Sequence, residues 1–440
     1  MPGDSQHRQD AVAVLRALRA AGHETYFVGG CVRDLVMGIE PHDFDIATAA
    51  TPAAVQAIFP NSGMVGAAFG VVQVQTPTGP VEVATFRSDS PYSDGRHPDR
   101  VTFSTARDDV LRRDFTINGM MLDPESGEIL DWVGGRDDIR RRRIRAIGDP
   151  RARFAEDKLR LLRAVRFAAR FGYAIDEDTY SALCATAGRL GEVSMERIRD
   201  ELVRLLCGPN AGRGLRLMHD IGLLRPVLPE IEALVGVEQP PQFHPEGDVF
   251  EHTCIMLDLA RSPSLELGMA ALLHDIGKPQ TQTFAEERIR FDEHDKAGEE
   301  MSRAITRRLK FSNEQTEQIA ALVGSHMRFA MVQRMKLSTL KRLLALPGFP
   351  DHLELHRLDC EASHRKLDNY EFLRRKLEEM SQEEISPPPL ITGRDLIDLG
   401  YKPGPRFHVI LSAVRDEQLE ARLTDQAAAI EFVRARYPLD

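Results

Sequence analysis

The sequence predicts an α+β unit at the N-terminus, followed by a chain that is helical almost to its end. Three observations lead to this prediction. Short β-type runs alternate with an amphipathic helix over residues 10–86. Apolar side chains then recur at helical spacing over 153–226 and 249–380. Prolines and one Gly-Asp-Pro turn separate these segments, and 440 residues suffice for about three domains of ~150 residues.

Residues 10–20 predict an amphipathic helix, because apolar side chains recur along one face. Short strands are predicted at 24–28 and 44–47. Residues 71–76 and 80–86 alternate on either side of a Pro-Thr-Gly turn, which predicts a hairpin.

Three proline-containing segments predict domain boundaries: Gly148-Asp149-Pro150, Pro240-Pro241 and Pro387-Pro388-Pro389. They give four predicted domains: a mixed α+β head at 1–150, a helical neck at 151–240, a second helical domain at 241–385 and a helical tail at 386–440.

The composition excludes several classes of protein. Hydrophobic residues make up 42% and charged residues 28%, which excludes global disorder. No apolar run approaches ~20 residues, so no membrane-spanning helix is expected. The polar N-terminus predicts no signal peptide. The five scattered cysteines are expected to be reduced thiols, which predicts a cytoplasmic protein.

The charge is unevenly distributed. The net charge is −10, yet residues 140–170 contain twelve Lys or Arg against three acids. Such a basic block indicates a local site for phosphates or an RNA backbone. On charge alone, a solvated helix face explains it equally well.

Asp43 and Asp45 flank Phe44 at the start of a predicted strand, so their side chains point to the same face. Two close carboxylates repel unless a cation lies between them, and oxygen ligands favour Mg²⁺. Glu82 in the hairpin could join them and allow two metal ions to support phosphoryl transfer. Most isolated Asp-x-Asp matches are instead pairs of surface acids.

The segment Val28-Gly29-Gly30-Cys31-Val32-Arg33-Asp34 links a predicted strand to a predicted helix. Glycines allow the backbone to approach a phosphate closely, and a helix N-terminus favours an anion. Arg33 would add a cation. Gly-Gly alone is weak, but its combination with the Asp pair within twenty residues is specific.

These motifs resemble the class II tRNA nucleotidyltransferases, the family of CCA-adding enzymes and bacterial poly(A) polymerases. The resemblance covers roughly residues 20–230 and implies a nucleotidyltransferase-fold head. It includes Gly29 to Asp34, Asp43 to Thr48, Val83-Ala84-Thr85-Phe86-Arg87, Arg112-Arg113-Asp114-Phe115-Thr116-Ile117-Asn118, Phe154 to Phe167, and Glu196-Arg197-Ile198-Arg199-Asp200-Glu201-Leu202.

The resemblance also implies roles for individual residues. Asp43 and Asp45 would bind catalytic Mg²⁺, with Glu82 as the supporting acid. Gly30 and Arg33 would hold the triphosphate, and Asp157 and Arg160 would pair with the base. Arg113 and Asp114 would contact the nucleotide, with Asp114 near the ribose 2′-OH. Apart from the resemblance, Arg163 and Arg166 continue this row of basic residues and are expected to meet phosphates.

The chemistry of Asp157 and Arg160 supports base reading independently. On one helix, residues at i and i+3 share a face. An acceptor and a donor together match the pairing edge of cytosine or adenine, whereas uracil and guanine present the reverse pattern. The alternative is an ordinary salt bridge between the two side chains.

A second constellation begins at His274-Asp275, which follows an apolar helix. Histidine with carboxylate suits Mn, Fe, Ni, Co or Zn better than Mg²⁺. This series resembles an HD-domain phosphohydrolase and implies a site for a transition metal or Mg²⁺. The implied ligands are His252, His274, Asp275, His294, His326 and Asp359, of which some histidines could instead be surface residues.

The leading hypothesis is an enzyme that adds CCA to the 3′ end of tRNA from CTP and ATP, with an accessory HD activity. The alternatives are a CC-adding or A-adding specialist, a poly(A) polymerase, or an HD phosphohydrolase whose N-terminal unit only binds RNA. Tyr92 to Pro98 resemble a flexible loop of complete CCA enzymes, whereas Phe69-Gly70-Val71-Val72 depart from the His-Gly-Thr of many of them. Leu399 to Pro405 predict a turn packed on the helices. No membrane partner is expected, and the oligomeric state is left open.

Overall fold

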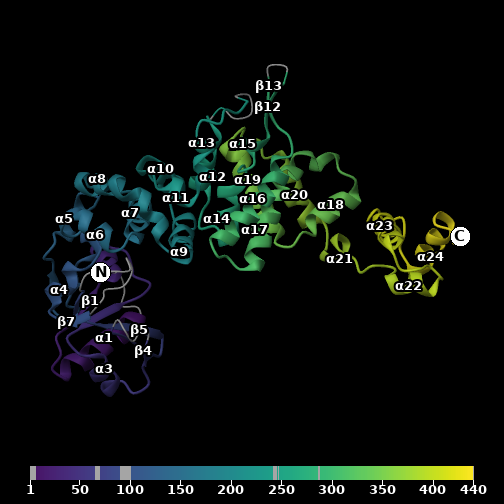
Figure 1. The fold of residues 1–440 in the computed structure, drawn as a ribbon. Coiled ribbons are helices and arrows are strands. Elements are labelled where there is room, and N and C mark those ends of the chain that lie inside the picture. The colour runs from purple at the N-terminus through teal and green to yellow at the C-terminus, as the bar shows by residue number, and fades with distance from the viewer. Residues whose placement is uncertain are drawn as a thin grey trace. The chain divides into compact units, whose positions relative to one another are not determined.

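The computed structural model describes residues 6–64, 70–89, 101–240, 245, 247–285 and 288–439. The chain divides into two compact units, Met1–Glu232 and Ala233–Asp440, and each is described by itself (Figure 1). The finer division at residues 150, 240 and 385 stays a prediction.

A mixed seven-stranded sheet organises the N-terminal part of the first unit, with strand order β3-β4-β5-β2-β1-β8-β9. Strands β2 and β5 run parallel, and the other neighbouring pairs are antiparallel. The strands are β1 (Thr25–Val28), β2 (Asp45–Thr48), β3 (Gly63–Met64), β4 (Val71–Thr76), β5 (Gly79–Thr85), β8 (Met121–Leu122) and β9 (Ile129–Leu130).

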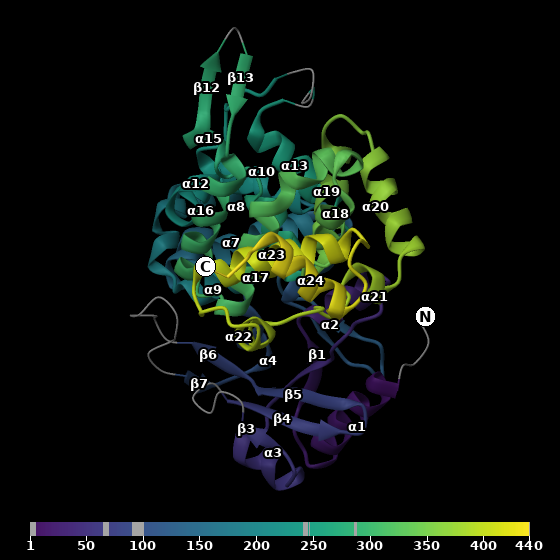
Figure 2. The same cartoon turned by 90° about the vertical axis from the view of Figure 1, so that its right-hand side faces the viewer.

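Helices cover both faces of this sheet. On one face, α1 (Gln6–Ala20), α2 (Gly30–Val36) and α3 (Pro52–Ile58) pack on a core around Phe27, and Figure 2 shows α1 and α3 beside β4 and β5. On the other face, α4 (Ala106–Leu111) packs against Val28. Phe27 and Val28 are neighbours in β1 but enter different cores because strand side chains alternate.

The rest of the first unit is mainly helical. Helix α7 (Leu159–Phe171) is its most buried helix and ends at Gly172 in the left-handed conformation. The other elements are β6 (Arg87–Asp89), β7 (Val101–Phe103), η2 (Thr116–Asn118), α5 (Gly135–Arg140), β10 (Arg143–Ile144), α6 (Pro150–Glu156), β11 (Ala174–Ile175), α8 (Glu177–Thr186), η3 (Ala187–Glu192), α9 (Met195–Leu206), α10 (Ala211–Ile221), α11 (Leu224–Val227) and α12 (Pro229–Glu232).

The second unit is a helical bundle with one hairpin, β12–β13, which projects from the helices in both views (Figures 1 and 2). Its elements are α13 (Val249–Leu259), α14 (Leu265–Leu273), α15 (Lys278–Thr281), β12 (Gln282–Ala285), β13 (Arg288–Phe291), α16 (His294–Arg308), α17 (Asn313–Ser325), η4 (His326–Arg334), α18 (Leu337–Leu344), α19 (Phe349–Ala362), α20 (Asp368–Glu379), α21 (Gln382–Ile385), α22 (Gly393–Asp398), α23 (Pro405–Leu419) and α24 (Gln426–Arg436).

The C-terminal helices α22 to α24 share a small apolar core. Tyr401, from the Leu399 to Pro405 motif, is buried in this core and donates a hydrogen bond to the carbonyl oxygen of Tyr437 at 2.6 Å. The predicted turn therefore packs within the tail's own core.

The predicted fold class, a mixed α+β head followed by helical domains, is confirmed. The sequence prediction missed β3, β6 to β11 and the β12–β13 hairpin. Most of these strands have only two or three residues, which is too short to give a clear alternation. Among the described helices, none is both long and apolar enough to span a membrane.

Candidate functional site

The first candidate site lies at the end of β1, where Gly29 has a φ of 73°. A Cβ atom at Gly29 would lie 3.1 Å from Arg113 Nη1 and 3.9 Å from Asp45 Oδ2. The missing side chain therefore allows Arg113 and Asp45 to approach the same turn, and helix α2 begins at the next residue, Gly30.

Asp45 begins β2, and its pKa is raised to about 6. Burial is the main cause, the negative charges of Glu82 and Asp43 add to it, and Arg113 opposes it. Ile46 of β2 pairs with Val83 of the parallel strand β5. Asp45 and Glu82 come directly before these two residues, so they lie at equivalent positions on neighbouring strands. The predicted cluster of three acids is thus electrostatically coupled, as a cation site requires.

The three acids are not gathered as closely as metal ligands. Among the described residues, the sets of ligand atoms that all lie within 4.8 Å of one another do not include Asp43, Asp45 and Glu82. Asp43 and Glu82 are exposed, and Asp45 is half-buried. Their oxygens would have to converge when a cation binds.

Arg33 is buried and engaged within the protein. Its guanidinium forms an ion pair with Asp34 at 2.7 Å, and its Nη1 donates to Asn118 Oδ1 at 2.7 Å. The ring of Phe171 lies 4.8 Å from the guanidinium carbon. The structure therefore places Arg33 beside Gly30 and in contact with Asn118, the last residue of the Arg112 to Asn118 segment.

Asp114 is held by Arg163 of α7. Burial raises the pKa of Asp114, but the charge and hydrogen bonds of Arg163 outweigh burial and bring the pKa to about 2. The Arg163 Nη2 lies 2.6 Å from Asp114 Oδ2, while Asp114 Oδ1 accepts from the amide of Phe115. Arg166 pairs with the buried Glu201 at 2.6 Å, so the two arginines connect α7 to other parts of the unit.

Asp157 and Arg160 do not share one continuous helix, which corrects the sequence-based placement. Asp157 has φ −141° and ψ 106° and separates α6 from α7. The cause is local capping, because Asp157 Oδ1 accepts from the amide of Leu159 at 3.0 Å. Asp157 Oδ2 pairs with Arg197 at 2.7 Å, whereas Arg160 pairs with Glu156 at 2.7 Å. Asp157 and Arg160 therefore do not form the salt bridge with each other that was the alternative prediction.

The pairing of Arg197 with Asp157 was not predicted from the sequence. A signal was present, since Arg197 follows Glu196 in a segment that resembles the family. Nothing local, however, indicates that its guanidinium reaches a carboxylate 40 positions earlier.

Acids from elsewhere in the unit neutralise much of the basic block at 140–170. The fully buried Asp138 pairs with Arg143 at 2.7 Å and Arg145 at 2.8 Å. Arg143 also pairs with Asp176. These pairs brace the fold around β10, so Arg143 is unsuitable for testing RNA contact alone. Arg142 and Arg151, which are exposed, are better suited.

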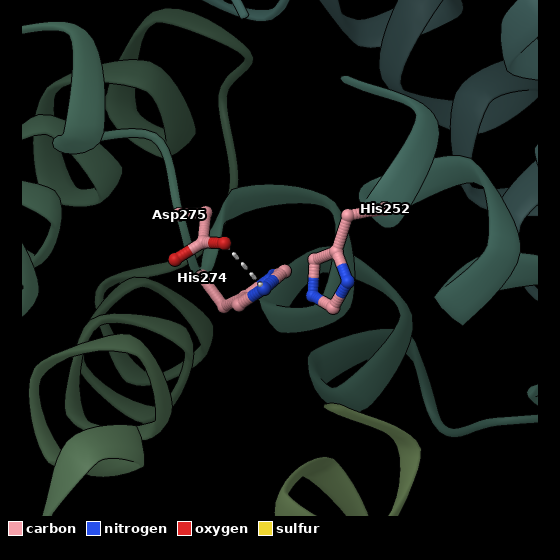
Figure 3. Close-up of side chains that lie close together, drawn as sticks. All are labelled: His252, His274 and Asp275. Atoms are coloured by element: carbon pink, nitrogen blue, oxygen red, sulfur yellow. Dashed lines mark ion pairs between the residues drawn. The ribbon is translucent and has the colours of Figure 1, made fainter. Parts of the chain in front are cut away.

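The second candidate site gathers His252, His274 and Asp275 in the second unit (Figure 3). His252 comes from α13, and the other two residues directly follow α14. His274 Nε2 lies 3.1 Å from Asp275 Oδ2. His252 Nε2 lies 3.2 Å from Asp359 Oδ1 of α19, which brings the fourth predicted ligand to this group.

Asp275 also belongs to a group with His294 and His326. Its Oδ1 lies 3.4 Å from His294 Nε2 and 3.9 Å from His326 Nε2. The two histidine Nε2 atoms are 3.2 Å apart. The structure thus brings all six predicted side chains together, while their role as ligands stays a prediction.

The tautomers of three histidines follow from the hydrogen bond that each makes through Nδ1, the ring nitrogen that does not face the cluster. The Nδ1 atoms of His274, His294 and His326 lie 2.9, 2.7 and 2.6 Å from backbone carbonyl oxygens. Because a carbonyl only accepts, each Nδ1 carries the hydrogen, and the Nε2 lone pairs face the cluster. Burial is the main cause that lowers the pKa of His326 to about 4. These neutral donors fit a divalent metal ion.

The cluster forms one wall of a cavity of about 620 Å³. Asp275, His294, His326 and Asp359 line it, together with the cations Lys278, Arg290 and Lys366. None of these three basic residues was predicted from the sequence as part of the site, although Lys278 closely follows Asp275. Carboxylate and imidazole donors beside cations can bind a metal ion and an anion in one cavity.

Gly277 controls the approach of this turn to α16. A Cβ atom there would lie 2.3 Å from the His294 carbonyl oxygen and 2.8 Å from the Gly298 amide nitrogen. Backbone contacts this close leave room only for glycine.

We therefore expect Gly277→Ala to separate Asp275 from His294 and to weaken Mn²⁺ binding at least about tenfold. Isothermal titration calorimetry on the full chain measures this effect. Gly188→Ala is the matched control, since a Cβ there meets nothing within 4 Å. Wild-type Mn²⁺ affinity in Gly277→Ala, with an unchanged melting temperature, would contradict the placement.

Three family models match the chain: the poly A polymerase head domain at residues 25–145, the probable RNA and SrmB-binding site of polymerase A at 172–234, and the HD domain at 249–359. These matches include the acids beside the Gly29 turn and the six residues of the second cluster, but not residues 157–166.

Curated relatives include the CCA-adding enzyme of Geobacillus stearothermophilus, 45% identical over 216 residues, and that of Limosilactobacillus reuteri (strain DSM 20016), 44% identical over 216 residues. Each alignment covers 49% of this chain and 53% of the relative. The chain therefore spans about half the length of the curated relatives it matches.

Solved structures extend the likeness along the whole chain. The Thermotoga maritima CCA-adding enzyme complexed with tRNA_CCA, at 20% identity and a TM-score of 0.59, covers 96% of this chain and shares the fold. The Bacillus stearothermophilus CCA-adding enzyme in complex with CTP is 30% identical, with a TM-score of 0.76, over 98% of this chain and 99% of that one. The agreement of fold, sequence and head-domain motifs over this length shows that the chain belongs to the family of CCA-adding enzymes.

Proposed function

We propose that the first unit adds C, C and A without a nucleic-acid template to the 3′ end of tRNA, using CTP and ATP and releasing pyrophosphate. The observation that carries this proposal is the coupled acid group of Asp45, Glu82 and Asp43 beside the Gly29 turn and Arg113. The named activity of the relatives and the CTP complex of the 30% identical structure support it.

In this mechanism, Asp43, Asp45 and Glu82 would hold Mg²⁺, which would activate the RNA hydroxyl and offset the charge of the triphosphate. Gly30 lets the chain pass close to the phosphates, and Arg33 supplies positive charge below them. Arg113 and Asp114 orient the nucleotide, while Arg163 and Arg166, paired with Asp114 and Glu201, fix this wall beside the phosphates.

Asp157 and Arg160 read the base. Arg197 and Glu156 hold the two side chains separately, so no salt bridge between Asp157 and Arg160 competes with the base. One acceptor and one donor can then face a base without first breaking a mutual salt bridge. Cytosine and adenine satisfy both groups, whereas uracil and guanine leave them unpaired.

The specialist alternatives add only CC, only A or a poly(A) tail. The sequence features that bear on this choice, Phe69 and the loop from Tyr92 to Pro98, lie outside the described residues. Product length on a tRNA that ends before CCA separates the alternatives, with CTP, ATP or both supplied.

For the second unit we propose a metal-dependent phosphohydrolase activity, carried by the six-residue cluster at the wall of the cavity. The imidazole-rich donor set favours Mn²⁺, Ni²⁺ or Co²⁺ over Mg²⁺. A bound metal would activate water for attack on a phosphoester. We place the protein in the cytoplasm; its five cysteines are free thiols.

Asp45→Asn is expected to reduce CTP incorporation at least about a hundredfold, because the amide cannot supply the charge that a metal ion requires. Extension of tRNA that lacks CCA measures incorporation, and a filter-binding assay measures tRNA affinity, which should stay within about threefold. Glu128→Gln, at an exposed acid, is the control. Near-normal incorporation by Asp45→Asn at saturating Mg²⁺ would sink the assignment.

Asp157→Ala should relax base choice roughly 10- to 100-fold, the equivalent of one charged hydrogen bond. Incorporation of UTP and GTP relative to CTP and ATP measures this change. Arg197→Met, which releases the Asp157 carboxylate, should act in the same direction with a smaller effect. Asp200→Ala alters an exposed acid on the same helix as Arg197 and should leave base choice unchanged. If Asp157→Ala keeps wild-type discrimination, the residue is only a helix cap.

The double change His274→Ala, Asp275→Ala should leave tRNA end-addition within a few fold and abolish metal-stimulated hydrolysis of bis(p-nitrophenyl) phosphate. The reason is that the two sites belong to separate compact units. A melting curve must accompany the assay, because both side chains are buried. A folded double variant that loses end-addition as fully as Asp45→Asn would show that the second unit serves nucleotidyl transfer directly.

A further inference from the structure

Lys278 is a buried cation in the wall of the second unit's cavity. It begins α15 and is 6% exposed. Its Nζ lies 2.6 Å from Asp275 Oδ2 and donates to Gln239 Oε1, also at 2.6 Å. The ring of Phe291 lies 5.4 Å away. An ammonium group needs such partners when it is removed from water, and here two of its three hydrogens have acceptors.

One of these partners has a second role. Asp275 belongs to both candidate metal groups. A divalent ion bound at either group would therefore interact with the carboxylate that now balances the charge of the Lys278 ammonium. The cluster contains two carboxylates, Asp275 and Asp359, and the ammonium of Lys278. With neutral imidazoles its net charge is about −1, and one divalent ion changes that to about +1.

The rim of the cavity does not change this balance. Two cations, Arg290 and Lys366, and two carboxylates, Asp292 and Asp368, line it, so their charges are equal in number and opposite in sign. The excess positive charge of a metal-loaded site is therefore concentrated at the cluster, where Lys278 lies. An anion is the ligand that this arrangement favours.

Gln239 is suited to hold Lys278 without cancelling its charge. It is 4% exposed, and among the described residues its Nε2 has no hydrogen-bond partner. The contact of its Oε1 with Lys278 thus orients the amide. A neutral acceptor fixes the ammonium in place and leaves the positive charge available, whereas a carboxylate at this position would neutralise it.

We propose that Lys278 binds a non-bridging oxygen of the substrate's phosphate group in this cavity and that Gln239 is the positioning residue for Lys278. This inference rests on the proposed phosphohydrolase activity and extends it. It gives the site a phosphate-binding side chain apart from the six candidate ligands.

The test uses the full chain loaded with Mn²⁺ and inorganic phosphate as the probe. Calorimetry gives the Mn²⁺ stoichiometry first and the phosphate affinity second, and hydrolysis of p-nitrophenyl phosphate gives kcat and KM. Lys278→Gln should keep Mn²⁺ and weaken phosphate binding at least about tenfold, with a matching rise in KM. Lys296→Gln, at an exposed lysine paired with Glu293, should bind phosphate like the wild type.

Gln239→Glu separates a charge effect from a structural one. It keeps an acceptor beside Lys278 but neutralises the ammonium, so phosphate binding should weaken while the melting temperature holds or rises. Gln239→Ala should weaken phosphate binding about threefold by releasing Lys278. If Lys278→Gln does not fold, Lys278→Arg keeps the charge and should retain phosphate affinity within about threefold.

Several results would overturn the proposal. Unchanged phosphate affinity in Lys278→Gln or Gln239→Glu would reduce Lys278 to a structural partner of Asp275. If Lys278→Gln no longer binds Mn²⁺, then Lys278 acts by positioning the metal ligands and not by binding phosphate. A wild-type protein that binds Mn²⁺ but not phosphate would refute the role of Lys278 and leave the metal cluster standing. A wild-type protein that binds no Mn²⁺ would refute the proposed hydrolase, and this inference with it.

Discussion

Carboxylates placed next to one another in a protein repel, and the first unit of this chain contains such a cluster. In the first unit, burial and the charges of Glu82 and Asp43 raise the pKa of Asp45 to about 6. In the second, the buried Asp275 lies among imidazoles and pairs with Lys278, while the partly exposed Asp359 faces His252. A cation relieves the repulsion in the first unit. In the second, the donors are instead gathered around one buried carboxylate, which a metal ion can share with Lys278.

The donor chemistry separates the two clusters. The first has only carboxylates, which match a hard ion such as Mg²⁺. The second has four histidines, three of them with Nδ1 directed at a backbone carbonyl. That contact fixes the tautomer, so the Nε2 lone pair is ready for a metal without reorganisation. The two sites are therefore expected to differ in metal preference and reaction.

Glycine has the same physical role at both sites. Gly29 lets Arg113 and Asp45 approach one turn, and Gly277 lets the His-Asp turn approach the backbone of α16. A methyl group at either position would displace a functional side chain. The two motifs can thus be recognised in sequence because a close backbone approach tolerates only one residue type.

Local pattern was enough to predict the helical segments and the strands β1, β2, β4 and β5, because periodicity is a property of neighbouring residues. It also predicted the Asp43, Asp45 and Glu82 acids and the six residues of the second cluster, since these were selected by chemistry and spacing. Family resemblance supplied what each would do. Very short strands such as β8 escaped prediction because two residues contain no pattern.

Only the tertiary structure decided which charges meet. The block at 140–170 is basic in sequence, yet Asp138, Asp114 and Glu201 neutralise many of its arginines. Asp157 turns out of the helix toward Arg197, and Lys278 reaches Gln239. Sequence spacing cannot indicate such pairs, because an ion pair depends on which surfaces pack together. The sequence by itself determined the chemical groups present, and packing decided which of them are neutralised and which remain available to a ligand.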